Sequence, residues 1–236
     1  MDKRMQSIMN DFENNKLGID STFQFHCTQC GACCTNREDI ILTPQDLFRI
    51  AKKKNISTKD VFLRYCEGYI GPFSRFPIVV LKAIGNMKKC PFLKNRKCSI
   101  HDVKPNICAI FPLGRAVQGK NIAVRNVLSG PLIEYFFSDP GCGNNSETHT
   151  VREWLDSFGM KPDDSFFAEW SHLQLELSMK LTEAEKQVNK KSMSQLWQLV
   201  RIYLYFKYDT DQEFYPQFQE NKQYLLTLMR TMPEVK

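Results

Sequence analysis

The residues most able to do chemistry are nine cysteines, all between Cys27 and Cys142 in a chain of 236 residues. Four of them form the motif CTQCGACC, in which Cys27, Cys30, Cys33 and Cys34 follow at spacings of three, three and one. A C-x-x-C turn brings two sulfur atoms within reach of one metal ion. Three cysteines at successive intervals of three also form the local half of many four-iron clusters. The motif therefore predicts zinc or iron binding, and its spacing slightly favours an iron–sulfur cluster.

A second group of cysteines lies in KCPFLKNRKCSIHDVKPNICAIFP and in the glycine-flanked loop that follows. Cys66 ends the apolar stretch VFLRYC and is expected to pack in the core instead. Eight thiols remain, which suits two four-thiolate centres or one polynuclear cluster. Neighbouring side chains point to different sides of an extended segment, so Cys33 and Cys34 can both bind only between two sites or inside one compact cluster. The predicted metal ligands are Cys27, Cys30, Cys33, Cys34, Cys90, Cys98, Cys108 and Cys142.

Other interpretations of these residues explain less of the pattern. A redox dithiol in CTQC would leave six further thiols unexplained. Ordinary buried cysteines would not place four thiols within eight residues. His101 and His26 could each replace a thiolate, although a hydrogen-bonding or surface role is commoner for histidine.

The number and setting of the cysteines also bear on location. Nine cysteines cannot all pair within the chain. The first twenty residues scatter charges and lack the continuous apolar stretch of a secretory signal. The longest apolar run is far shorter than a membrane span. We therefore expect a cytoplasmic protein without membrane contact, where a reducing environment keeps thiols free for metal.

The net charge of +6 is modest, but cationic side chains are interleaved with the second cysteine group. Four thiolates on one zinc ion carry excess negative charge, which is costly to bury unless cations surround it. The basic residues are expected to supply this compensation and to lower the thiol pKa values. With its aromatic residue, KKCPFLKNRKC could instead contact nucleic acid, but charge compensation explains it equally well, so nucleic acid is not the expected partner. The cations are Lys88, Lys89, Lys94, Arg96, Lys97 and Lys104.

Helices and short strands must position these thiols. Thr43 and Pro44 predict a helix start, since a hydroxyl can cap free amides and proline suits the first turn. Apolar spacing gives that helix a buried stripe, and a second helix is expected from Ser57 or Thr58 through VFLRYC. PIVVLKAI predicts a strand, CSIH and NIAVRNVL are weaker strand candidates, and KPNICAIFP predicts one short helical turn. The stripe consists of Leu47, Ile50 and Ala51.

From about Thr148 the pattern is helical almost to the end. The expected fold is α+β and predominantly helical: a small, irregular cysteine-cluster domain with a few short strands, followed by a C-terminal region of four helices. The expected domains are residues 22–147 and 148–236.

The motifs together resemble a known bacterial family, the CxxCxxCC proteins with a zinc- or iron-chelating domain. Its pattern includes C-x-x-C-x-x-C-C, Leu-Thr-Pro-x-Asp, C-P-F-L, C-x-I-(Tyr or His), (Arg or Lys)-P-x-x-C and F-P. This chain has CTQCGACC, ILTPQD, CPFL, CSIH, KPNIC and IFP in that order. Lys104 stands where arginine is commoner, and His101 where tyrosine is commoner. The resemblance implies metal chelation.

A similar cysteine cluster occurs in flagellin lysine methylases, which use S-adenosylmethionine. This chain lacks the Gly-rich strand–turn–helix that would bind a nucleotide. The leading hypothesis is therefore a metal-binding protein, with metal ions and a protein partner or substrate as its partners. The alternatives are a metal- or iron–sulfur-dependent enzyme, for example one like a protein-lysine methyltransferase, and a zinc-stabilised nucleic-acid-binding module.

Overall fold

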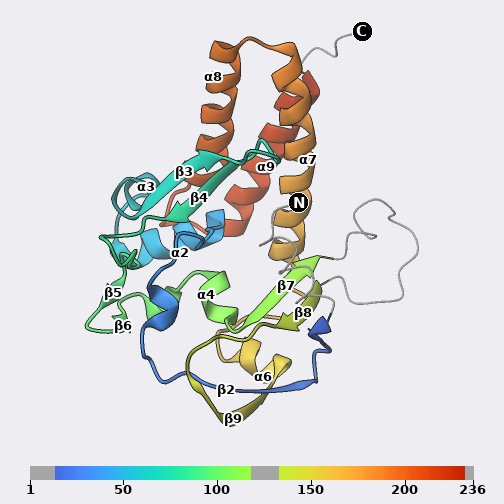
Figure 1. Cartoon of the computed structure of the whole chain (residues 1–236). Coiled ribbons are helices and arrows are strands. Elements are labelled where there is room, and N and C mark those ends of the chain that lie inside the picture. The colour runs from blue at the N-terminus through green and yellow to red at the C-terminus, as the bar shows by residue number, and fades with distance from the viewer. Residues whose placement is uncertain (1–13, 118–132, 232–236) are drawn as a thin grey trace.

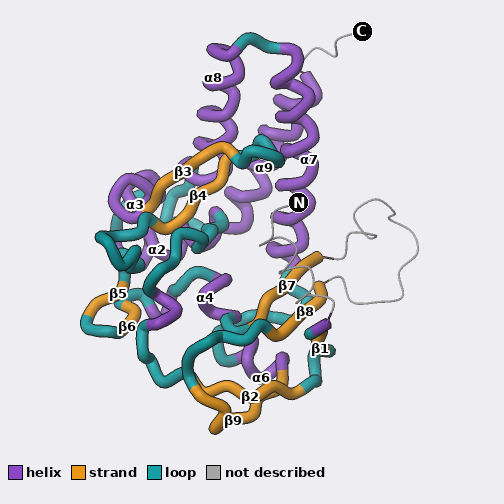
Figure 2. The backbone as a smooth tube through the Cα atoms, in the orientation of Figure 1, coloured by secondary structure: helices purple, strands orange, loops and turns teal. Residues whose placement is uncertain are grey.

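The computed structural model describes residues 14–117 and 133–231. Small antiparallel sheets and short helices form one part of the molecule, and long helices form the other (Figures 1 and 2). This arrangement confirms the expected α+β class with a helical C-terminal region. The weak strand candidate NIAVRNVL lies outside the described residues.

Two helices follow the first cysteine motif, as the sequence predicts. α2 (Pro44–Lys54) begins with a capping box, in which the Thr43 side chain accepts from the Asp46 amide and Asp46 accepts from the Thr43 amide. α3 (Thr58–Tyr65) begins after Ser57, whose hydroxyl accepts from a backbone amide. The predicted stripe of α2 is confirmed, because no surface is exposed on Leu47, Ile50 or Ala51.

The predicted strand in PIVVLKAI is β4 (Pro77–Leu81), which pairs antiparallel with β3 (Cys66–Ile70). α3 ends at Tyr65, one residue before the predicted end, and Cys66 both caps the helix and begins the strand. The expected burial of Cys66 is confirmed, since the residue is 6% exposed and lies in a hydrophobic core.

The other strands are short. CSIH does not form the strand that was predicted: Cys98 ends the two-residue β6, and a 3-10 turn follows from His101 to Val103. The sheets are β1 (Lys16–Leu17) with β8 (Ile133–Phe137) and β7 (Leu113–Val117), β2 (Thr22–His26) with β9 (Asn144–Thr150), and β5 (Leu93–Lys94) with β6 (Lys97–Cys98).

The C-terminal region is helical, as expected. In Figure 1, α7, α8 and α9 stand side by side beyond the β3–β4 hairpin. No helix in the described ranges is long and apolar enough to cross a membrane. The helices are α6 (Val151–Asp156), α7 (Ser165–Gln187), α8 (Lys190–Arg201), a π-helical turn (Ile202–Phe206) and α9 (Phe214–Thr231).

Two hydrophobic cores stabilise the molecule. The first joins α2, β3 and β4 to α7, α8 and α9, and the second joins β2, β7 and β8 to α6. α4 (Asn106–Ile110) is the predicted short helical turn and contacts both cores: Cys108 packs against the first, and Ala109 and Ile110 belong to the second. The first core draws on both sides of residue 147, and the division into residues 22–147 and 148–236 stays a prediction.

Candidate metal centre

The CxxCxxCC segment follows β2 and turns sharply at Gly31. Gly31 has a φ of +75°, a left-handed conformation that glycine adopts without strain. A 3-10 turn (Ala32–Cys34) follows, and the Cys34 amide donates to the Gly31 carbonyl at 3.0 Å. The turn places the thiols of the vicinal cysteines on one side, with 4.0 Å between the sulfur atoms of Cys33 and Cys34.

The second cysteine group lies directly beside this turn. The Cys90 amide donates to the Cys34 carbonyl at 2.9 Å, and the two thiols interact closely enough to shift each other's pKa. The Leu93 amide then returns to the Cys90 carbonyl at 3.1 Å, so that the β5–β6 hairpin begins next to the thiol. Cys98 is the last residue of that hairpin and lines the same cavity as Cys34 and Cys90.

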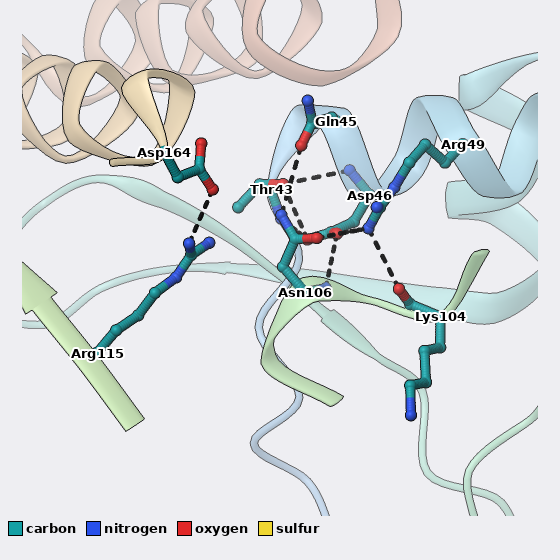
Figure 3. Close-up of polar contacts among 8 residues, drawn as sticks. All are labelled: Thr43, Gln45, Asp46, Arg49, Lys104, Asn106, Arg115 and Asp164. Atoms are coloured by element: carbon teal, nitrogen blue, oxygen red, sulfur yellow. Dashed lines mark hydrogen bonds and ion pairs between the residues drawn. The ribbon is translucent and has the colours of Figure 1, made fainter. Parts of the chain in front are cut away.

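A buried carboxylate holds the third segment in place (Figure 3). Asp46, only 1% exposed, accepts from the Asn106 amide at 2.9 Å and from Arg49 at 2.8 Å. Arg49 also donates to the Asn106 side chain at 2.7 Å and to the Lys104 carbonyl at 3.2 Å. These bonds tie the start of α4, and hence Cys108, to α2.

In the sequence, Asp46 stands out only as the last residue of the motif ILTPQD. Arg49 and Asn106 were not singled out, and their contact spans 57 residues of chain. The one local signal was the i, i+3 spacing of Asp46 and Arg49, which often pairs charges on a helix.

Six of the eight predicted ligands line one cavity of about 310 Å³. The remaining two, Cys30 and Cys142, are not part of this lining but interact with each other, since Cys142 lowers the pKa of Cys30 and Cys30 raises that of Cys142. The structure thus brings together thiols from segments more than fifty residues apart. The cavity-lining ligands are Cys27, Cys33, Cys34, Cys90, Cys98 and Cys108.

Within residues 14–117 and 133–231, no three Cys, His, Asp or Glu side chains are arranged so that they could hold one ion as they lie. The chemistry of the donor set nevertheless fits zinc or iron, because soft thiolates are preferred ligands of both zinc centres and iron–sulfur clusters. The cavity wall is rich in such donors, and their role as ligands stays a prediction.

The thiols influence one another strongly. A hydrogen bond with Cys34 raises the pKa of Cys33, and burial adds to the effect. The bond from Cys33 lowers the pKa of Cys34, but Cys90 and burial outweigh it and bring the pKa to about 11. Burial raises the pKa of Cys108 and brings that of Cys142 to about 11. Only an added positive charge would therefore favour several thiolates here at once.

Two thiols have lowered pKa values because of hydrogen bonds. Cys30 accepts from the Ala32 amide, which lowers its pKa against the effect of burial. The pKa of Cys90 is lowered chiefly by its interaction with the thiol of Cys34. These sulfur atoms would be the first to ionise and to meet a metal ion.

Of the six cations expected to compensate the thiolates, Lys104 is the one that lies among the cysteine side chains. It is half-buried, burial lowers its pKa, and its charge lowers the pKa values of Cys33 and Cys98. Arg37, which sequence analysis did not single out, also lowers the pKa of Cys33. The other five cations are exposed, although Arg96 and Lys97 reach the cavity wall.

The candidate histidines differ in their surroundings. His101 lines the cavity, and burial lowers its pKa. His26 instead faces Glu147, with 2.7 Å between Nδ1 and Oε1. Cys66 stands apart from the other thiols, since burial alone raises its pKa to about 12.

The fold and the site define a class of protein: an α+β cysteine-cluster protein whose thiols meet between two cores. Residues 26–127 match the model of the CxxCxxCC family, which is described as "Putative zinc- or iron-chelating domain". The resemblance drawn from the cysteine motifs is thereby confirmed over these residues. Cys142 lies beyond the matched range, so its assignment rests on its contact with Cys30.

An uncharacterized protein of Methanocaldococcus jannaschii is 34% identical over 117 residues. The match covers 46% of this chain and 56% of that protein, so the chain spans little more than half of its relative's length. No solved structure matches the chain.

Proposed function

We propose that this is a cytoplasmic metal-binding protein whose eight predicted ligands hold zinc or iron, with an iron–sulfur cluster as the preferred form. The observation that carries the proposal is the convergence of six thiols on one cavity, with the Cys30–Cys142 pair beside it. Three successive cysteines at intervals of three favour iron–sulfur, as in many four-iron sites.

We infer that the thiols further divide into two groups, which suits two centres, with Cys33 between them because it also interacts with Cys34, Cys98 and Cys108. In the inner group, each thiol carries a charge interaction or hydrogen bond with every other member. In the outer group, Cys142 interacts with each of the other three. The vicinal pair Cys33 and Cys34 contributes one thiol to each. The inner group is Cys34, Cys90, Cys98 and Cys108, and the outer group is Cys27, Cys30, Cys33 and Cys142.

An enzyme was the main alternative, and an open coordination position or a pocket beside the cluster would favour it, whereas closed four-thiolate sites favour a binding role. Six thiols form part of the cavity wall, and apolar side chains such as Ile40, Phe92 and Phe111 form much of the rest. The convergence of the thiols supports metal binding, and no residue of the wall is assigned a catalytic role.

Metal content of single variants, purified without oxygen, tests the proposal. Cys98→Ser should remove the inner metal, and Cys142→Ser should remove or weaken the outer one, because each deletes one of four ligands. Cys66→Ser is the matched control, since Cys66 is a buried cysteine remote from the cluster, and its metal content should equal that of the wild type. Equal metal content in all three variants would contradict the proposal.

A further inference from the structure

The residues between β4 and the end of the β5–β6 turn form a cationic rim, defined as residues 82–97. This stretch holds six basic side chains and no acidic one, and all six are exposed. Lys88 pairs with Glu38 at 2.6 Å, and the other five make no ion pair within the described parts of the chain. Lys104 and Arg37 are the cations that lower the pKa of Cys33, whereas the six rim cations extend over an exposed surface.

The rim is held in a fixed shape. Ile84 and Lys89 exchange both backbone hydrogen bonds, at 2.8 and 3.0 Å, and close one turn. The Met87 carbonyl accepts from the Asn36 amide at 3.0 Å, which attaches this turn to the segment after the cysteine motif. A surface that is already ordered loses less conformational entropy when a partner binds.

The second turn of the rim holds a cation in a conformation that favours glycine. Asn95 and Arg96 form a two-residue hairpin loop with φ values of +50° and +64°. Asparagine tolerates this region, but a long side chain such as that of Arg96 is uncommon there. Lys88, at +45°, repeats the pattern in the first turn. Both turns therefore present a cation at a position where a long side chain is uncommon.

Aliphatic side chains accompany these charges. Ile84 is 54% exposed and Met87 is 57% exposed, both in the first turn. The aromatic Phe92 of the rim is buried, so the rim offers no exposed ring on which a nucleic-acid base could stack. The exposed Phe73 lies at the β3–β4 turn, at the opposite end of that hairpin from Lys82.

We propose that the cationic rim is a docking surface for an acidic protein that presents carboxylates around aliphatic side chains. The carboxylates would pair with Lys89, Lys94 and Arg96, and the aliphatic groups would cover Ile84 and Met87. The rim borders the thiol cavity through Arg96 and Lys97, so the docked partner lies at the mouth of that cavity. The proposal stands independently of which metal the thiols hold.

The test measures binding of a labelled helical peptide of repeating Glu and Leu to the full-length protein by fluorescence anisotropy. A Glu/Ser peptide of equal charge and a single-stranded oligonucleotide are the comparison probes. At about 150 mM salt, which screens plain charge attraction, the Glu/Leu peptide should bind most tightly. Lys89→Glu with Arg96→Glu should weaken it roughly tenfold, and Ile84→Ser with Met87→Ser should weaken it while sparing the Glu/Ser peptide.

Lys190→Glu with Lys191→Glu, on exposed lysines at the start of α8, is the matched charge control and should change affinity less than about twofold. Far-ultraviolet circular dichroism and metal content verify that each variant is folded. The double variant Lys89→Gln with Arg96→Gln removes the two charges without reversing them, and it should weaken peptide binding less than the Glu variant. Peptide binding that is absent, or that the rim variants leave unchanged, overturns the proposal. Tighter, rim-dependent binding of the oligonucleotide overturns it in favour of a nucleic-acid surface.

Discussion

At the scale of the residue, Asp46 connects the helix start that the sequence predicts to the thiol that the site needs. Its carboxylate accepts from Thr43, Arg49 and Asn106, and it is almost fully buried. A buried acceptor with several donors is costly to replace, since each donor loses a partner that water cannot supply. The segment carrying Cys108 therefore depends on a residue that is not itself a predicted ligand.

Asp46→Asn should lower the free energy of unfolding by about 2 kcal/mol, because the amide presents donors where the carboxylate accepted. It should also lower metal occupancy, since the start of α4 loses its attachment to α2. Urea denaturation and metal analysis measure the two effects. Asp60→Asn is the matched control, because Asp60 also accepts a hydrogen bond at a helix start but is only half-buried and accepts none from α4. Full metal occupancy in Asp46→Asn would contradict this role.

At the scale of the element, α7 and α9 are joined by a polar cluster around Glu169. Tyr215, Gln219 and Lys222 of α9 each donate to its carboxylate at 2.7 Å. Burial alone would raise the pKa of Glu169, but these three bonds outweigh it and hold the pKa below the ordinary value of 4.5. The carboxylate therefore stabilises the folded protein above pH 4.5, and this contribution is lost as the pH falls through the lowered pKa.

Glu169→Gln should destabilise the protein by about 1–2 kcal/mol at neutral pH. The difference from the wild type should shrink below pH 4.5, where the wild-type carboxylate takes up a proton. Thermal unfolding of both proteins over a pH series measures the difference. Glu183→Gln, on an exposed residue of the same helix, should show no such trend. A difference that stays constant with pH would show that the charge of Glu169 does not matter.

The helices and strands differ in how well they can be predicted from the sequence. α2, α7, α8 and α9 could be predicted because apolar periodicity and capping residues are local signals. β2 could not be predicted, because its partner strand is distant in the sequence, as the pairing of Phe23 with His149 shows. No local sequence signal indicates such a partner. The eight candidate thiols could be chosen from spacing, whereas the Cys30–Cys142 contact and the Asp46 network depend on tertiary structure.

At the scale of the whole molecule, the thiols lie where the two hydrophobic cores meet. Cys90, Cys98 and Cys108 pack against the first core. β2 of the second core leads into Cys27, and its partner strand β9 follows Cys142. A metal centre that joins these segments would couple the two cores. Thiolate–metal bonds contribute on the order of 10 kcal/mol in small structural sites, comparable to the stability of a whole domain.

Removal of metal with a chelator should therefore loosen the cysteine region more than the long helices. Hydrogen exchange should accelerate in β2, β9 and α4, whose attachment runs through the thiols, and change least in α7 and α9. Backbone amides of α7 serve as the internal control in the same sample. Unchanged protection throughout residues 22–117 after complete chelation would show that the metal does not hold the fold together.

Metal and acid-labile sulfide analysis of the wild-type protein, purified without oxygen, is the decisive measurement of metal binding. We expect stoichiometric bound metal and few thiols that react with a thiol reagent before chelation. In the preferred form the metal is iron with sulfide, and the brown colour bleaches on reduction. About two zinc ions per chain without sulfide would reject the iron–sulfur form and keep the metal-binding claim. A colourless, metal-free protein whose cluster thiols all react at once would contradict the account.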